Sequence, residues 1–345
     1  MAAPALTPAL MDEIQRCKGE GRSKSYTADI LNLSRNTVRK YWHFSPSFRT
    51  DEQEPEQTTT HYKRTLTAAR KEITTLRTQL AGYRARKYGK AVKYPSVVII
   101  PDSHAHPEYD NDRFEWLGKY IEEHKPDLIV DIGDFGDMPS LSHYDRGRRS
   151  FEGRRYLKDI EAVMDAQDRL RDAAGEAWDS AHKVRCRGNH DGERIDRLTQ
   201  ERPELYGLVS TDDLRDKEYG WEVYPFQVPA IFDGIAYAHY FASGVAGRPI
   251  SGENIGKSLI QKSHHSCVQG HSHMFDHAER TRIDSTKLFG LSVGCYAHPG
   301  MVEGWNTATH HMWWRGIVHL QGVDGEGYYR EMSSVTQSAL RKRYG

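Results

Sequence analysis

Gly188-Asn189-His190-Asp191 places an amide, an imidazole and a carboxylate within four residues of one another. The stretch directly follows the apolar and basic run 182–186, a pattern that predicts a strand ending in a turn. In open α/β sheets, functional groups gather outside the carboxyl ends of strands. The stretch therefore predicts a functional site built on loops of an α/β fold.

Three more clusters of metal-ligating residue types follow strand-like runs in the same way. Their carboxylate and imidazole groups suit a divalent cation, and none of the clusters contains the cysteine that softer metals prefer. The clusters and the runs before them are Asp102-Ser103-His104 after 96–100, Gly133-Asp134-Phe135-Gly136-Asp137 after 127–130, and Gly270-His271-Ser272-His273 after 266–269.

The number of candidate ligands is sufficient for two cations. A pair of ions about 3.5–4 Å apart needs one bridging carboxylate and a separate ligand set on each side. Asp134 is the natural bridge, with Asp102, His104 and one C-terminal histidine for one ion. Asn189 and two further histidines would hold the other ion. His190 then remains free to protonate a leaving oxygen or to neutralise charge in the transition state.

The order of these motifs over residues 95–300 resembles the calcineurin-like metallophosphoesterase family. The resemblance implies a four-layer α/β/β/α sandwich that carries two divalent ions, with Mn²⁺ favoured and Fe, Zn²⁺ or Mg²⁺ as alternatives. It also implies a hydroxide activated by two metals and His190 as the catalytic histidine. The implied ligands are Asp102, His104, Asp134 and His273 for one ion, and Asp134, Asn189, His239 and His271 for the other.

Several neighbouring residues have alternative interpretations. His239 is followed by Tyr240, whereas glycine usually follows this histidine in the family. Asp137 and Asp191 are expected to orient His104 or His190, with surface carboxylates as the alternative. The remaining histidines are better explained by packing or solvent exposure than by substrate contact; they are His106, His264, His265, His298, His310 and His311.

Composition sets the broad class of the protein. The length of 345 residues fits two or three domains. No run approaches the roughly 18 apolar residues of a membrane span, and no secretory signal is visible. The four cysteines form no C-x-x-C pair, so a reducing, cytoplasmic setting is expected.

The net charge of zero conceals two oppositely charged parts. Residues 1–94 hold 18 Lys and Arg against 9 Asp and Glu, and the remainder holds 30 against 39. A basic front part joined to an acidic body favours a nucleic-acid-binding module attached to a second domain.

Residues 1–45 predict a helix-turn-helix domain. Asn32 tolerates the left-handed backbone of a tight turn, and Ser34 can cap the helix that follows. That helix would bury Val38, Tyr41 and Trp42, and it resembles the recognition helix of transposases and site-specific recombinases. The alternative is a three-helix module for protein contacts. The candidate DNA-binding residues are Arg35, Asn36, Thr37, Arg39 and Lys40.

Residues 46–60 predict a polar linker, and residues 61–92 predict an amphipathic helix with three heptads. Residues 61–90 could pair in a parallel homodimer, or the helix could lie on its own catalytic domain. The catalytic domain is expected at 93–332, followed by a disordered basic tail at 333–345. The arginine-rich insert 140–155 is expected either to contact a phosphate backbone or to be a solvated loop.

Taken together, these patterns favour a DNA-directed phosphodiesterase, that is, a nuclease, from a bacterium or a phage. The motifs equally allow a protein or small-molecule phosphatase or phosphodiesterase. A third possibility is a DNA-binding regulator whose phosphoesterase site is secondary.

Overall fold

The computed structural model describes residues 8–42, 94–302 and 310–345, and the chain divides into two compact units, residues 1–85 and 86–345. The predicted linker and heptad segment, 46–60 and 61–92, lie outside the described residues. No helix within the described ranges is long and apolar enough to cross a membrane.

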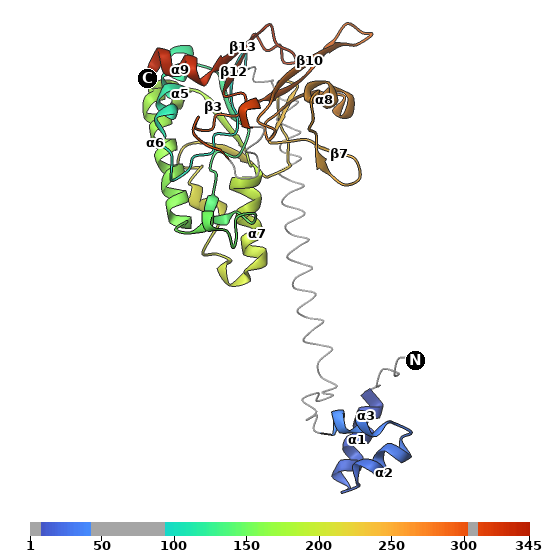
Figure 1. The fold of residues 1–345 in the computed structure, drawn as a ribbon. Coiled ribbons are helices and arrows are strands. Elements are labelled where there is room, and N and C mark those ends of the chain that lie inside the picture. The colour runs from blue at the N-terminus through green and yellow to red at the C-terminus, as the bar shows by residue number, and fades with distance from the viewer. Residues whose placement is uncertain (1–7, 43–93, 303–309) are drawn as a thin grey trace. The chain divides into compact units, whose positions relative to one another are not determined.

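The first unit contains three short helices around a small core (Figure 1). Asn32 is left-handed with φ 51°, and the Ser34 hydroxyl caps the third helix by accepting a 3.1 Å bond from the Thr37 amide, both as predicted. Val38 and Trp42 are buried, whereas Arg35 and Lys40 are exposed. The helices are α1 (Pro8–Gly19), α2 (Lys24–Ile30) and α3 (Arg35–Tyr41).

The second unit is built on two β-sheets, so the predicted α/β class is confirmed. In the six-stranded sheet, β1 to β4 run parallel, and β12 and β13 add antiparallel strands at one edge. The order across this sheet is β13 (Glu331–Thr336), β12 (Gly316–Gln321), β1 (Ser96–Ile100), β2 (Leu128–Asp131), β3 (His182–Cys186) and β4 (Glu222–Tyr224).

The five-stranded sheet has β6, β9 and β11 running parallel at its centre. Its order is β10 (Phe275–Thr281), β11 (Lys287–Val293), β9 (Ser266–Gln269), β6 (Ile235–Ala238) and β5 (Ala230–Phe232). A separate two-stranded hairpin is formed by β7 (Ala242–Ser243) and β8 (Arg248–Pro249).

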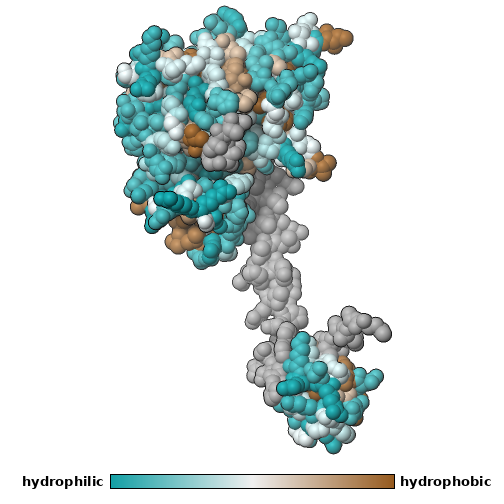
Figure 2. All heavy atoms as spheres, viewed as in Figure 1, coloured by the Kyte–Doolittle hydropathy of each residue, from teal (hydrophilic) through white to brown (hydrophobic). Residues whose placement is uncertain are grey.

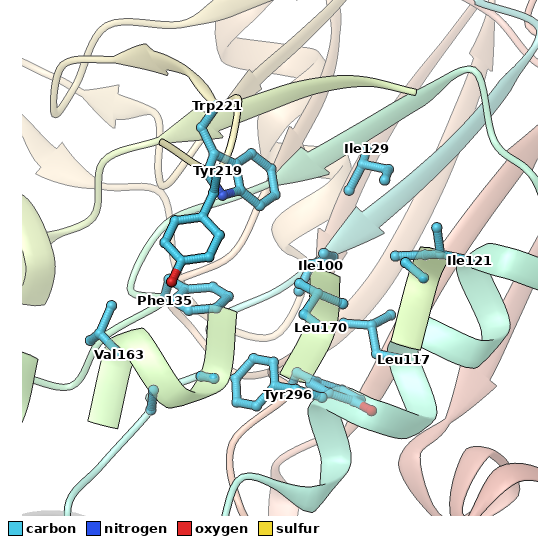
Figure 3. Packing of buried hydrophobic residues seen from close by; sticks show 14 of the residues in the cluster. Ile100, Leu117, Ile121, Ile129, Phe135, Val163, Leu170, Tyr219, Trp221 and Tyr296 are labelled. Carbon is cyan, nitrogen blue, oxygen red and sulfur yellow. The ribbon is translucent and has the colours of Figure 1, made fainter. Parts of the chain in front are cut away.

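Alternating side chains of the central strands fill two different cores. Val97 and Ile99 of β1 pack with Tyr237 of β6 between the sheets. Ile100 of the same strand faces the opposite way, where it joins the core formed with α5 and α6. Figure 3 shows Leu117 and Ile121 of α5 in that core. The outer helices are α5 (Asp112–His124), α6 (Tyr156–Ser180) and, on the five-stranded sheet, α8 (Ile255–Ser263).

β4 and β5 follow one another in the chain but belong to different sheets. One sequence expectation for this unit, the disordered tail, was wrong. The tail is ordered, because Leu340 is buried and Thr336 caps helix α9 (Gln337–Tyr344). Tyr344 also donates a 2.6 Å hydrogen bond to Glu123 of α5.

The remaining short elements follow the strand ends. Helix α7 (Arg194–Glu201) continues directly from a π-helical turn, η3 (Asn189–Glu193). The short 3-10 turns are η1 (Pro139–Leu141), η2 (Arg149–Phe151), η4 (Pro203–Leu205), η5 (Thr211–Leu214) and η6 (His310–Met312). On the face visible in Figure 2, the described surface is mainly hydrophilic and its hydrophobic spots are small and separate.

Candidate metal centre

The predicted ligands come together at the carboxyl ends of strands from both sheets. Asp102 and His104 follow β1, Asp134 follows β2, and Asn189 follows β3. The histidines of the second sheet follow β6 and β9. Within the described residues, three groups of side chains are close enough to hold a metal ion: Asp102, His104 and His273; His104, Asp134 and His190; and Asp102, Asp134 and His239.

Hydrogen bonds between backbone segments join the loops that carry these groups. The His104 amide donates to the Asp134 carbonyl over 2.9 Å, and the Ala105 amide donates to the Phe135 carbonyl over 2.7 Å. The carboxylate of Asp134 accepts a 2.7 Å bond from the His190 amide. These bonds therefore hold the loops that follow β1, β2 and β3 in one rigid arrangement.

The candidate ligands fall into two neighbouring sets. In the first set, the Nε2 atoms of His104 and His273 are 3.1 Å apart, and His273 Nε2 is 3.2 Å from Asp102 Oδ2. In the second set, His239 Nε2 is 2.8 Å from Asn189 Oδ1 and 3.1 Å from His271 Nδ1.

Asp134 lies next to both sets. Its Oδ2 atom is 3.2 Å from His239 Nε2, and Asp134 also forms a group with His104 and His190. Burial raises the pKa of Asp134, but His239, His190 and His104 lower it more, so the net pKa is well below its usual value. The carboxylate is thus held as an anion between the sets.

Hydrogen bonds fix which nitrogen of two histidines faces the centre. His104 Nδ1 is 2.9 Å from Asp137 Oδ1, and His239 Nδ1 is 3.3 Å from the Ile132 carbonyl. Both partners are oxygen acceptors, so each Nδ1 carries the proton. Each Nε2 atom then faces the other candidate ligands, as is usual for histidines that bind metals.

The centre concentrates acceptor atoms that would repel one another without a positive charge. Burial lowers the pKa of His239, but Asp134 and Asp102 raise it to about 9, so a proton on Nε2 supplies that charge in the metal-free centre. The buried Asp102 Oδ1 has no hydrogen-bond partner among the described residues. The donor set and this unpartnered oxygen fit divalent cations.

The backbone makes room for the carboxylates through two glycines. A Cβ atom on Gly188 would lie 2.0 Å from Asp134 Oδ1, and one on Gly270 would lie 2.0 Å from Asp102 Oδ1. The left-handed region, uncommon for residues other than glycine, is adopted by four candidate ligands: His104, Asp134, His271 and His273, with φ of 47°, 53°, 65° and 58°. Such clustering of backbone strain is typical of functional sites.

The two predicted orienting carboxylates have different contacts. Asp137 Oδ1 is 2.9 Å from Nδ1 of both His104 and His190. Asp191 instead accepts hydrogen bonds from the amides of Phe135 (3.0 Å) and Gly188 (2.9 Å). The expectation that Asp191 orients an imidazole is therefore not met, because its carboxylate joins two loop backbones.

His190 has a residue beside it that the sequence analysis missed. Arg194 Nη2 lies 3.0 Å from His190 Nε2. The i, i+4 spacing of the two residues was the available signal, because residues four apart are neighbours on a helix.

Two aromatic rings also lie against candidate ligands. The Trp313 ring is 4.2 Å from that of His273, and the Tyr240 ring is 4.9 Å from that of His271. Tyr240 thus forms part of the wall of the centre.

The histidines expected to pack or to meet solvent lie outside the three groups of described residues that could hold a metal ion. His106 is buried beside Tyr109, and His298 stacks on the same tyrosine. His264 ends α8, and His310 and His311 lie in η6. In the arginine-rich insert, Arg146 pairs with Glu201 and Arg154 with Asp145.

Comparisons with known proteins identify one curated relative. The chain is 28% identical over 246 residues to Gene 54 protein of Mycobacterium phage L5, which covers 69% of this chain and 93% of the relative. No protein-family model matches the chain.

The solved structures that align with this chain are less similar to it in sequence than the phage protein is. The crystal structure of Pseudomonas putida nuclease MPE aligns with 66% of this chain and 84% of its own, at 12% identity and a TM-score of 0.28. A second solved structure aligns with 71% of this chain and 100% of its own, at 10% identity and a TM-score of 0.35.

Proposed function

We propose that this protein is a divalent-metal-dependent phosphodiesterase that acts on nucleic acid, and that its first unit binds DNA. The observation that carries the proposal is the convergence of two imidazole pairs, an amide oxygen and two buried carboxylates at the strand ends. We also propose that the layered packing of the second unit is the calcineurin-like sandwich.

In this proposal, each of the two sets would hold one ion, and Asp134 would serve both. Asp102, His104 and His273 would complete the first set, and Asn189, His239 and His271 the second. Two such cations, Mn²⁺ by preference, supply Lewis acidity and activate water for attack at phosphorus.

The protein's own groups then orient the catalytic histidine. His190 Nδ1 lies 2.9 Å from the Asp137 carboxylate and 3.0 Å from the Asp137 carbonyl, so this nitrogen is the one that donates. In the imidazolium form, which carries a proton on each ring nitrogen, Nε2 is the atom that can pass its proton to the leaving oxygen. Asp137 therefore sets the direction of proton transfer without contacting the substrate.

The experiment that tests this function is a metal and substrate series. Chelated protein should be inactive and should recover with Mn²⁺ more than with Ca²⁺, which prefers larger all-oxygen shells. Linear DNA, circular DNA and a generic phosphomonoester should be compared as substrates, with Asp134→Ala as the control for the centre. Full activity in excess chelator, or in Asp134→Ala, would rule out the metal mechanism. Hydrolysis of the phosphomonoester alone would instead indicate a phosphatase.

A further inference from the structure

Arg194 is a buried cation at the edge of the candidate centre. It is the first residue of α7, and only 9% of its surface is exposed. One guanidinium nitrogen, Nη1, donates a 2.7 Å hydrogen bond to the Asp137 carbonyl, and the other, Nη2, lies 3.0 Å from His190 Nε2. The side chain is therefore fixed against the catalytic histidine.

The charge of Arg194 has no anionic partner among the described residues, as its contacts are two backbone carbonyls and an imidazole. Two other arginines of this unit have such a partner, whereas the buried Arg113 likewise bonds only carbonyl oxygens. Arg197, one turn along α7, pairs with Glu193 and Glu201, and the fully buried Arg185 pairs with Asp131 and Asp216. A buried charge without a counter-charge is costly, so the position favours an anion supplied from outside the chain.

The contact with His190 locates this anion. His190 Nδ1 donates to Asp137, so Nε2 is an acceptor, and Arg194 donates to it. An oxygen anion that entered beside Nε2 would offer the guanidinium a stronger, charge-assisted hydrogen bond than a neutral imidazole does. Arg194 would then turn from His190 to the anion, and Nε2 would no longer accept its hydrogen bond.

We propose that Arg194 binds a non-bridging oxygen of the substrate phosphate beside His190. The proposal rests on the proposed phosphoesterase function and adds a phosphate-binding residue to it. The alternative is a purely structural role, in which Arg194 ties down the carbonyls of Asp137 and Met138, a turn where Met138 has φ 50°.

The test compares Arg194→Lys and Arg194→Gln with the matched control Arg197→Gln. Binding of inorganic phosphate to the metal-loaded protein should be measured by calorimetry, with metal content and thermal unfolding recorded for each variant. Loss of a charge-assisted bond should weaken phosphate binding roughly 10- to 100-fold in Arg194→Gln and less in Arg194→Lys. Arg197→Gln should bind phosphate like the wild type.

A second readout separates binding from structure. In Arg194→Ala, added guanidinium ion should restore part of the turnover of a small phosphodiester. Unchanged phosphate affinity in Arg194→Gln, or a loss that only follows lost metal or stability, would overturn the assignment. If the wild type hydrolyses no phosphoester, the function proposed above fails, whereas phosphate binding that depends on Arg194 would still stand. If the wild type also binds no phosphate, both fail.

Discussion

At the scale of single residues, Asp137 links two roles that the sequence could not distinguish. One carboxylate oxygen bonds the Nδ1 atoms of His104, a candidate ligand, and His190, the candidate acid. The sequence allowed Asp137 to orient either histidine, because residue spacing cannot show that one oxygen serves both. A single side chain thus couples the position of the centre to that of the proton donor.

The role of His190 leads to a prediction about turnover. His190→Ala should keep its metal but lose on the order of 10²–10⁴ in turnover, the usual contribution of general acid–base assistance. The loss should be smaller for substrates with good leaving groups, which need less protonation. Steady-state kinetics and metal analysis measure both effects, with His298→Ala as control. Collapse of the metal content in His190→Ala would mean that His190 is a ligand.

Another buried histidine should make stability depend on pH. His319 bonds Ser96 Oγ (2.8 Å) and the Tyr120 hydroxyl (2.9 Å), and burial, with a smaller effect of His124, lowers its pKa to about 4 from 6.5. The unfolded chain therefore binds a proton before the folded one does. Stability from this group is complete above about pH 6.5 and is lost as the pH falls towards 4.

The measurement is the unfolding midpoint of chelated protein between pH 4 and 7. Replacing His319 by Gln, which keeps hydrogen-bonding capacity, should make the midpoint fall less steeply with acid. The exposed His143→Gln serves as the control. Equal slopes for His319→Gln and the wild type would show that His319 does not contribute.

At the scale of elements, strands and their ends were the most predictable features. Runs such as 96–100 alternate between two cores, and β-branched residues in such runs favour strands. The pairing of the strands within the two sheets was less predictable. Pro225 and Pro229 mark a break between β4 and β5, yet local composition cannot tell that the chain changes sheets there. The tail was misjudged because its basic residues conceal the buried side chains of Gln337 and Leu340.

The glycines of the loops give a prediction at this scale. Gly188→Ala or Gly270→Ala should displace the adjacent carboxylate, because the new Cβ would overlap its Oδ1. Metal affinity should fall on the order of 10- to 100-fold, as for other residues that support ligands. Titration with Mn²⁺ measures the loss, and Gly19→Ala, where the Cβ has open space, is the control. Wild-type affinity in both loop variants would contradict the proposed centre.

At the scale of the whole molecule, the two units differ in net charge and, in our proposal, in function. The basic first unit has its own core, centred on Ile14, Ala28 and Val38. The exposure of its α3 arginines could be predicted from helical periodicity. The DNA sequence that the unit would recognise could not be predicted. The second unit contains all the candidate ligands.

This division predicts separable activities. Residues 95–345 should hydrolyse a small phosphodiester at a near-normal rate but bind duplex DNA more weakly. The DNA affinity should also depend less steeply on salt. Each lost phosphate contact reduces the slope of log binding constant against log salt concentration by about 0.9. In the full chain, Arg35→Ala or Asn36→Ala should weaken the free energy of binding to a preferred DNA sequence by about 1–3 kcal/mol if these side chains contact bases.

Filter binding over a salt series measures both quantities. Arg16→Gln is a suitable control, because this α1 arginine pairs with Glu13 and Glu20. Identical DNA affinity and salt slope for the full and shortened chains would make the first unit a protein-contact module.

The candidate ligands come from both sheets, with Asp102 and Asp134 on one and His239, His271 and His273 on the other. A cation bound among them would cross-link the two halves of the second unit. Only the folded chain brings these ligands together, so cation binding would add to the free energy of unfolding, by about 2.7 kcal/mol at a hundred times the dissociation constant. The lifetime of the folded enzyme in a cell would then follow the supply of free metal, and starvation for metal would remove the protein as well as its activity.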